Sequence, residues 1–360
     1  MHKLFGSAYE GRTVLVTGDT GFKGSWLCLW LEKLGATVIG YADNIPTRPS
    51  HYALLKMGYK SYRGDICDRV KLTSIIKKHK PDIVFHLAAQ SLVRSSFMNP
   101  IETYRANVLG SLAVMEAVRM SGMVKGLINV TTDKVYENEE VIKAYVETDR
   151  IGGYDPYSSS KACVEILSDS YRRSFFDDAG ILMVTARAGN VIGGGDWAKD
   201  RLVPDIMRSV GKNQQVVIRN PRSIRPWQHV LEPLSGYLLL GQRVLDKKAD
   251  IAGAWNFGPD SDQCVSVLDV LKALQKSWTA VDYLLAAETD EKYHEAKILM
   301  LSFEKVRRQL GWESVWKLEA TARHTAEWYK AYFKNRESLA EIQLDKYVKD
   351  AKRARMIWSI

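Results

Sequence analysis

The sequence has few cysteines, and they form no recognisable framework. Cys28, Cys67, Cys163 and Cys264 are scattered over 360 residues, with no Cys-x-x-Cys pair and no shared spacing with histidine. This pattern argues against a disulfide scaffold and against a zinc site. Scattered thiols are typical of a reducing compartment, so we expect a cytoplasmic protein that holds no metal.

Long apolar runs are also missing. The richest run, residues 25–31, is much shorter than the roughly twenty apolar residues of a membrane-spanning helix. Residues 1–10 lack the apolar segment and the cleavage site of a signal peptide. We therefore expect neither membrane association nor secretion.

Low-complexity segments and a concentrated charge of one sign are absent as well. Hydrophobic residues make up 46% and charged residues 26% of the chain, which is the composition of a folded globular protein. The length predicts one large domain or two joined ones. The net charge is +9, but the basic residues are interspersed with 42 acidic ones along the chain. The dense basic tract is the C-terminal segment that starts at Lys349. This distribution argues against a nucleic-acid partner, whereas it suits the steering of a small phosphorylated substrate.

The first half of the chain alternates short apolar runs with longer helical stretches, which is typical of βαβ units. The runs are apolar throughout, as expected for strands buried on both faces. We predict an α/β fold with a Rossmann-like doubly wound parallel sheet. The predicted strands are residues 13–16, 37–41, 82–86, 127–131 and 181–185. The predicted helices are residues 24–34, 103–120 and 158–176, with Gly35 as the left-handed residue that ends the first of them.

After about Gly189 glycine and proline become frequent and the alternation weakens. This change predicts a second, smaller region that interleaves with the first. The predicted first domain is residues 1–189 with a returning segment around residues 225–250, the second domain is residues 190–224 and 251–335, and the C-terminal tail is residues 336–360.

A glycine-rich turn lies between the first predicted strand and the first predicted helix. Gly18, Gly21 and Gly24 have the spacing G-x-x-G-x-x-G, which lets backbone N–H groups hold a pyrophosphate at the helix N-terminus. Such a turn can also merely relieve backbone strain. Asp43 follows the second strand, nineteen residues beyond Gly24, where a carboxylate accepts from ribose hydroxyls and repels a 2′-phosphate. NAD is therefore favoured over NADP, and the nearby Arg48 is the one feature against this preference.

A second pattern places Tyr157 and Lys161 four residues apart on one helix face. There the ammonium can stabilise a phenolate and prepare the tyrosine as an acid or base. The strand at residues 127–131 ends close to Thr132, Asp133 and Lys134. All five side chains can converge at the carboxyl edge of the sheet.

These segments together resemble the extended short-chain dehydrogenase/reductases that act on nucleotide sugars, and most closely their 4,6-dehydratase branch for CDP-linked sugars. The resemblance spans about residues 10 to 335. The segments that carry it are residues 17–24 (TGDTGFKG), 86–90 (HLAAQ), 131–136 (TTDKVY), 157–161 (YSSSK), 187–197 (RAGNVIGGGDW) and 224–230 (IRPWQHV).

The resemblance implies a complete set of catalytic roles. Tyr157, with Lys161, takes the proton of the sugar C4 hydroxyl while hydride passes from C4 to NAD, and Thr132 polarises the C4 oxygen. The resulting ketone acidifies the C5 hydrogen, and Asp133 protonates the leaving C6 hydroxyl. The hydride then returns to C6 and leaves a 4-keto-6-deoxy sugar.

Two positions depart from related enzymes. Lys134 stands where dTDP-sugar dehydratases have a glutamate that serves as the C5 base. A lysine needs a depressed pKa to act as that base, and the alternative is that Lys134 stabilises an enolate-like intermediate. Asp19 lies inside the glycine turn, where the CDP-sugar branch commonly has histidine. A carboxylate beside a pyrophosphate is unfavourable unless it faces solvent.

The resemblance also implies the remaining contacts of a NAD-binding domain and a nucleotide-sugar-binding domain. Arg201 and Arg225 are the expected clamps of the substrate pyrophosphate, with Asn190 as a neutral donor, because a diphosphate needs paired donors. Surface salt bridging is the alternative for both arginines. The other expected cofactor contacts are Thr20, Phe22, Asp65, Ile66 and Ala88.

The expected partner is a CDP-hexose, and alternatives remain open. A sugar 4-epimerase would use the same tyrosine, lysine and NAD but needs no acid such as Asp133. A dehydratase of another CDP-linked sugar and a non-catalytic nucleotide-binding scaffold are further possibilities. The helices at residues 103–120 and 158–176 have apolar residues on more than one face, including Val108, Leu112, Val118, Val164 and Leu167. Family members pair through such helices, so we expect a homodimer or a homotetramer.

Overall fold

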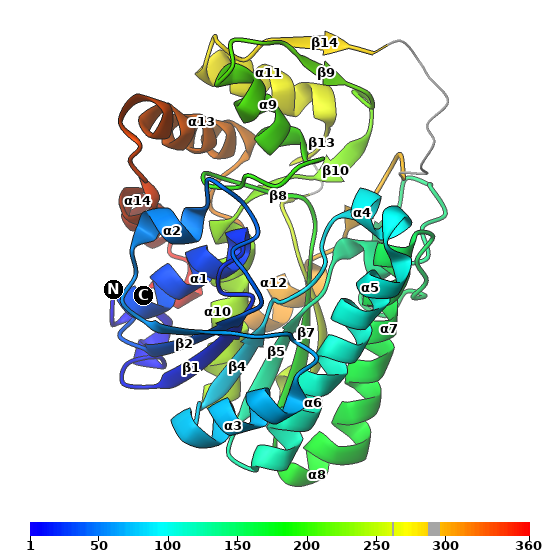
Figure 1. The fold of residues 1–360 in the computed structure, drawn as a ribbon, viewed down its shortest axis with the longest axis vertical. Coiled ribbons are helices and arrows are strands. Elements are labelled where there is room, and N and C mark those ends of the chain that lie inside the picture. Colours follow the sequence, from blue (N-terminus) through cyan, green and yellow to red (C-terminus); the bar gives the residue numbers. More distant parts are fainter. Residues whose placement is uncertain (261–262, 287–295) are drawn as a thin grey trace.

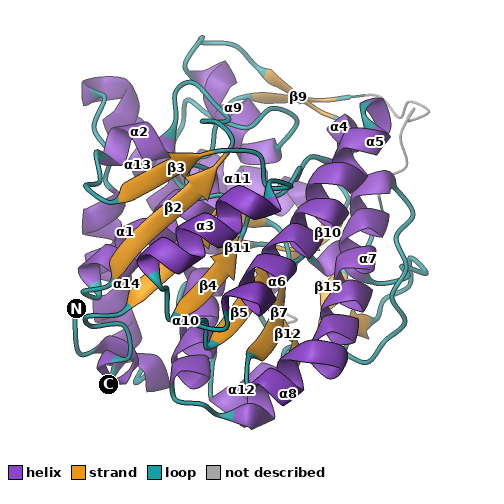
Figure 2. Ribbon diagram, turned by 60° about the horizontal axis from the view of Figure 1, so that its bottom comes forward, coloured by secondary structure: helices purple, strands orange, loops and turns teal. Residues whose placement is uncertain are grey.

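The centre of the computed structural model is a seven-stranded sheet (Figures 1 and 2). The model describes residues 1–260, 263–286 and 296–360. The strand order is β12-β7-β5-β4-β1-β2-β3, and every neighbouring pair is parallel. The predicted doubly wound α/β fold is confirmed. The strands are β1 (Thr13–Thr17), β2 (Thr37–Ala42), β3 (Lys60–Arg63), β4 (Ile83–His86), β5 (Gly126–Val130), β7 (Leu182–Ala188) and β12 (Gly253–Phe257).

Helices cover both faces of this sheet, and each face has its own apolar core. Figure 2 shows α3 (Arg69–His79), α6 (Gly110–Ser121) and α7 (Pro156–Tyr171) across one face. The buried side chains of α3 and α6 form one cluster with the strands, and Leu167 and Tyr171 of α7 pack against it. On the other face α1 (Phe22–Lys33) and α10 (Leu231–Leu245) pack against the strands within the larger cluster. Burial on both faces explains why the strands are apolar throughout.

The first helix shows how the sequence sets these boundaries. Trp26 and Trp30, one turn apart on α1, are fully buried. Gly35, just beyond the helix, has φ of +85°, which a residue without a Cβ adopts at little cost. The predicted left-handed end is confirmed.

The two other predicted helices are each interrupted by a wider turn. Residues 103–120 lie in α5 (Pro100–Tyr104), a π turn at Arg105–Leu109 and α6. Residues 158–176 lie in α7 and a second π turn at Arg172–Phe176, which α8 (Asp177–Ala179) follows. Both helical predictions therefore hold over their length, although the hydrogen-bond pattern changes within each.

A smaller region lies beyond the carboxyl ends of the large sheet, at the top of Figure 1. It contains α9 (Leu202–Val210), α11 (Val267–Ser277) and α13 (Leu318–Asn335). Its strands pair two by two, as β8 (Val191–Ile192) with β11 (Gln228–His229), β9 (Val216–Ile218) with β14 (Tyr283–Leu285), and β10 (Ile224–Pro226) with β13 (Cys264–Ser266). A further pair, β6 (Ala144–Tyr145) with β15 (Met300–Leu301), lies near α12 (Glu304–Leu310).

The division of the chain into two domains stays a prediction. Because α10 packs on the large sheet and β12 forms its edge, we propose that the returning segment extends to Phe257 rather than to about residue 250. Residues 251–257 then belong with the first domain.

The segment predicted as a tail is helical and packs on the first domain. It contains α14 (Ala340–Arg353) and a short 3₁₀ turn, Ile357–Ser359. Trp358 is buried and stacks on Phe5 and Tyr347, at ring-centroid distances of 5.2 and 5.8 Å. The phenol of Tyr347 donates to Glu232 on α10 over 2.7 Å. This segment therefore completes the outer layer over α1 and α10.

No helix in the described part of the chain is both long enough and apolar enough to span a membrane.

Candidate active site

A cavity of about 1230 Å³ lies between the large sheet and the smaller region. It opens where the strand order reverses at β1 and β4, which is where doubly wound sheets bind their ligands. All the residues predicted as catalytic, cofactor-binding or substrate-binding line this cavity. The fold thus brings them together from segments between residues 18 and 225 of the sequence.

The glycine turn joins β1 to α1, and at Gly18 and Gly24 it has no room for a Cβ atom. A Cβ on Gly24 would lie 2.0 Å from the carbonyl oxygen of Gly18, and a Cβ on Gly18 would lie 2.7 Å from the backbone nitrogen of Ala88. Gly18 also has φ of +74°, and Gly21 N–H donates to the Gly18 carbonyl over 3.1 Å. The turn therefore brings bare backbone and the N-terminus of α1 to the cavity wall, a cradle that suits a diphosphate.

The adenosine end of the expected dinucleotide has acidic groups at the ends of β2 and β3. Asp43 is exposed at the cavity, and its carboxylate accepts from the backbone N–H of Asn44 over 2.7 Å and from the Asn44 side-chain amide over 2.9 Å. Asp65 forms an ion pair with Arg105. The N–H of Cys67 and the Arg105 guanidinium lower the pKa of Asp65. The donor and acceptor set fits a dinucleotide with free ribose hydroxyls.

Asp19 does not face solvent, contrary to the condition set by the sequence. Its side chain is buried and turns away from the cavity towards β2 and β3. One carboxylate oxygen accepts from Ser61 over 2.6 Å and from Tyr59 over 3.0 Å. Burial raises the pKa of Asp19, although both hydrogen bonds oppose this rise. A carboxylate is tolerated here because it points away from the phosphate cradle.

Thr132 and Tyr157 lie at the centre of the predicted catalytic cluster. Thr132 follows β5 and Tyr157 lies in the first turn of α7, where Asp155 caps the helix by accepting from Ser158 N–H over 2.9 Å. Burial raises the pKa of Tyr157 to about 12, while a hydrogen bond with Thr132 acts in the opposite direction. The phenol is therefore protonated at neutral pH in this structure.

Asp133 has one satisfied and one unsatisfied carboxylate oxygen. Its Oδ1 accepts from Thr132 Oγ1 over 3.0 Å and lies 3.5 Å from Lys134 Nζ. Its Oδ2 is buried without a hydrogen-bond partner among the described residues. A Cβ on Gly189 would lie 3.2 Å from that oxygen. An unpaired buried carboxylate oxygen is costly, and a hydroxyl or proton from a ligand would satisfy it.

Lys161 lines the cavity on the same helix as Tyr157. Its Nζ donates to the carbonyl of Val130 over 3.1 Å. Burial lowers the pKa of Lys161 to about 8. The expected stabilisation of a Tyr157 phenolate by this ammonium stays a prediction.

The two expected pyrophosphate clamps differ in their surroundings. Arg201 lies in the cavity wall with a side chain that is 34% exposed. Arg225 is buried, and its guanidinium donates to the carbonyls of Ile224, Ala296 and Lys297. Asn190 also lines the cavity. Arg201 is thus the arginine with the greater access to a ligand, whereas Arg225 also holds the neighbouring backbone.

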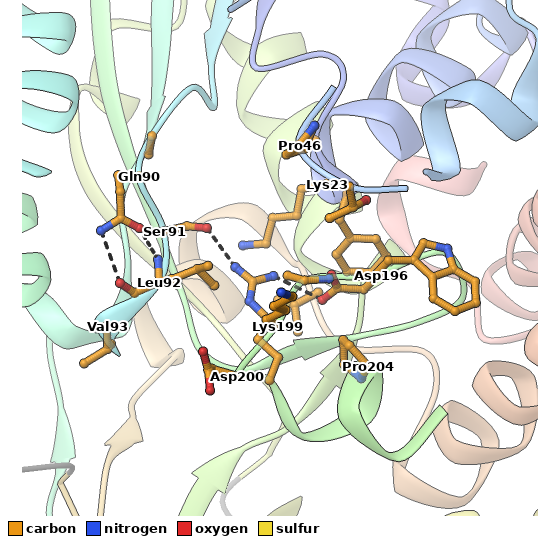
Figure 3. A pocket seen from close by; sticks show the side chains of 18 of the residues that line it. Lys23, Pro46, Gln90, Ser91, Leu92, Val93, Asp196, Lys199, Asp200 and Pro204 are labelled. Carbon is orange, nitrogen blue, oxygen red and sulfur yellow. Dashed lines mark hydrogen bonds and ion pairs between the residues drawn. The ribbon is translucent and has the colours of Figure 1, made fainter. Parts of the chain in front are cut away.

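Sequence reasoning missed three cavity residues that Figure 3 labels. Lys23, in the first turn of α1, points into the cavity, where burial and the charge of Arg201 lower its pKa to about 7. The sequence could have indicated Lys23, because a cation in the first turn of a helix is unfavourable beside the positive end of the helix dipole, and such a residue often has a functional role. Asp196 lies inside the segment of residues 187–197 that carries the family resemblance, but no role was predicted for it. Ser91 had no signal, because it matters only through a partner far along the sequence.

Comparisons with known proteins identify relatives in sequence and in fold. A family model described as GDP-mannose 4,6 dehydratase matches residues 15–325. The chain is 47% identical to the CDP-glucose 4,6-dehydratase of Salmonella typhimurium over 339 residues, which cover 92% of this chain and 94% of the relative. Among solved structures, an epimerase from Methanothermobacter thermautotrophicus shares the fold with a TM-score of 0.79, 25% identity and coverage of 91% and 94% of the two chains. The dTDP-glucose 4,6-dehydratase of Bacillus anthracis, in complex with NAD, has a TM-score of 0.72, 20% identity and coverage of 90% and 97%.

The fold and these matches define an enzyme of the extended short-chain dehydrogenase/reductase class. Within that class, the chain belongs to the GDP-mannose 4,6-dehydratase family of nucleotide-sugar enzymes.

Proposed function

We propose that this protein is a NAD-dependent CDP-glucose 4,6-dehydratase, which forms CDP-4-keto-6-deoxyglucose and so begins deoxysugar synthesis for surface polysaccharide. The observation that carries the proposal is the Asp133-Lys134 pair beside Tyr157 in one cavity. The identity of 47% to a CDP-glucose dehydratase over most of both chains supports the choice of nucleotide.

The cavity supports NAD as the cofactor. The cradle of Gly18, Gly21 and Gly24 would hold the pyrophosphate, and Asp43 would accept from the adenosine ribose. Thr20, Phe22, Asp65, Ile66 and Ala88 are the other proposed contacts, and each lines the cavity. Bound NAD supplies the acceptor and later the donor of the hydride that moves from C4 to C6 of the sugar.

The chain's own groups would move the protons. Tyr157, as the phenolate that bound NAD and the Lys161 ammonium would favour, removes the proton of the C4 hydroxyl, and Thr132, which shares a hydrogen bond with that phenol, holds the C4 oxygen. Asp133 protonates the C6 oxygen as it leaves as water, and its unpartnered Oδ2 is the atom for this task. Lys134 removes the C5 proton or stabilises the resulting enolate, within 3.5 Å of Asp133. Lys161 anchors the end of β5 and would orient the cofactor beside Tyr157.

A C4 epimerase is the second candidate, because a solved epimerase has the same fold. Epimerisation expels no hydroxyl and needs no acid at the C6 oxygen, so it gives no task to the buried Oδ2 of Asp133. The dehydratase assignment accounts for that atom, which favours it over the epimerase.

A substrate panel tests the proposal. The purified protein is incubated with NAD and with CDP-, dTDP-, GDP- or UDP-glucose, and the product is followed by its alkaline absorbance and by mass spectrometry. We expect a 4-keto-6-deoxy product, lighter by one water, from CDP-glucose in preference to the others. Formation of CDP-galactose, with no loss of water, would assign the enzyme to the epimerases instead.

We also propose a homodimer and a cytoplasmic location. Ile101, Leu109 and Ile166 are 83%, 54% and 62% exposed on the adjoining segments α5, its π turn and α7. Of the residues expected to serve this contact, Val118 and Val164 are instead buried within the chain. The exposed trio supports a helix-to-helix interface, and a monomer in light scattering would contradict it. The scattered free cysteines support the location.

A further inference from the structure

Two segments from different regions of the fold meet across the cavity. Residues 90–93 follow β4 of the large sheet, and residues 196–204 lead from β8 into α9. Figure 3 shows Gln90, Ser91, Leu92 and Val93 on one side and Asp196, Lys199, Asp200 and Pro204 on the other. Side chains that link these segments therefore control the width and shape of the cavity between them.

Arg201 is held from both sides of this gap. Its Nη2 donates to Ser91 Oγ over 2.8 Å, and its Nη1 donates to Asp196 Oδ2 over 3.1 Å. Asp196 is the better fixed of the two partners, since only 5% of its side chain is exposed and its Oδ1 accepts from Ala198 N–H over 3.1 Å. The guanidinium is therefore fixed in orientation before any ligand arrives.

We propose that Ser91 and Asp196 are positioning residues, which hold the Arg201 guanidinium over the cavity for the diphosphate of the nucleotide sugar. This inference rests on the proposed function, because it takes Arg201 as a diphosphate ligand. Neither residue is proposed to touch the reacting atoms. Both act through the arginine.

The physical reason is the conformational freedom of arginine. A long side chain loses much rotamer entropy when a ligand immobilises it, and a side chain that is already fixed loses less. Ser91 and Asp196 occupy one N–H on each terminal nitrogen, so the remaining N–H groups keep a defined direction. The carboxylate also offsets part of the positive charge. The fixed orientation of Arg201 strengthens diphosphate binding, whereas the negative charge of Asp196 weakens it. We expect the effect of orientation to be the larger of the two.

Asp196→Asn changes both effects at once, so the direction in which CDP affinity shifts shows which effect is larger. An amide has a single acceptor oxygen, so the variant can keep the contact with Ala198 N–H or the contact with Arg201, but not both. Ser91→Ala loosens the arginine from the other side and leaves the carboxylate intact. The matched control is Asp260→Asn, a carboxylate-to-amide change at an aspartate that is ion-paired with Arg307 outside the cavity wall.

The experiment measures the dissociation constant of CDP by calorimetry, together with KM and kcat for CDP-glucose. For Asp196→Asn we expect the dissociation constant and KM to rise about tenfold, and for Ser91→Ala about threefold, with kcat within about twofold. The Asp260→Asn control should stay within about twofold of the wild type. In an Arg201→Ala background, both substitutions should have no further effect, because they act through the missing side chain.

Three results would overturn the inference. The first is CDP binding that is unchanged or tighter in both single variants. The second is a weakening of CDP binding by these substitutions that persists in the Arg201→Ala background. The third is a decrease in kcat with no change in the CDP dissociation constant or in KM. Because CDP binding needs no turnover, the sugar assignment can fail while this inference stands. Conversely, if the wild type converts CDP-glucose and both variants keep its CDP affinity and KM, the inference is wrong while the proposed function stands.

Discussion

At the scale of single residues, the state of the Tyr157 phenol is the decisive feature. Burial raises its pKa to about 12, so the removal of the C4 hydroxyl proton needs this phenol to ionise within the assembled site. We expect Tyr157→Phe to lower kcat by about 10² to 10⁴ with KM little changed, because a general acid/base is lost. Steady-state kinetics with CDP-glucose measure this. Tyr154→Phe, three residues earlier and 79% exposed, is the control and should retain activity.

The same scale shows what a motif can and cannot predict. Tyr157, Asp133 and the glycines were predictable because each type of chemistry requires those residues at a fixed spacing or at a strand end. Lys161 was placed correctly in the cavity, but its partner, the Val130 carbonyl, depends on side-chain geometry that no spacing shows. Ser91 was not predictable, because its role arises from a contact with a residue 110 positions away.

At the scale of elements, the close packing of the turn between β1 and α1 predicts how a substitution at Gly24 affects cofactor binding. A Cβ at position 24 would lie 2.0 Å from the Gly18 carbonyl oxygen, which is backbone that cannot move aside cheaply. We therefore expect Gly24→Ala to displace α1 from the turn and to weaken NAD binding by more than about tenfold. Fluorescence titration with NAD measures the affinity. Gly58→Ala, where no atom lies within 4 Å of the added Cβ, is the matched control.

The elements also divide into those that periodicity reveals and those that it does not. β1 and β4 are buried on both faces, and their unbroken apolar runs identified them. β3, with the sequence KSYR, is the edge strand of the sheet and is only partly buried, so it has no such run. The two- and three-residue strands of the smaller region, such as β8 and β9, are too short for any period. Their pairing depends on long-range contacts.

At the scale of the whole molecule, buried neutral histidines govern the response to acid. Burial lowers the pKa of His51, His86 and His229 to about 3 each. The unfolded chain, with histidine pKa values near 6.5, binds more protons between pH 3 and 6.5, so stability is complete above pH 6.5 and falls below it. Glu232 opposes this trend, because burial raises its pKa to about 7 and its contribution is lost as pH rises from about 4.5 to 7.

Urea unfolding at several pH values checks this balance. We expect the free energy of unfolding to fall by about 3 kcal/mol between pH 7.5 and 5.5. The three histidines contribute a loss of about 4 and Lys23, with its lowered pKa, a loss of about 1, while Glu232 contributes a gain of about 2. Glu232→Gln removes the opposing contribution and should make the acid-induced loss steeper. A free energy that rises on acidification over this range would contradict the assignment of these histidines as neutral.

The stacking of Trp358 on Phe5 links the order of synthesis to the order of folding. Phe5 and Trp30 emerge from the ribosome among the first residues of the chain, yet the ring that covers them is made more than three hundred residues later. Until then the outer surface of α1 is an open aromatic patch, accessible to chaperones and to other nascent chains. The first domain can therefore reach its final packing only after translation has passed residue 358, even though its sheet is nearly complete long before.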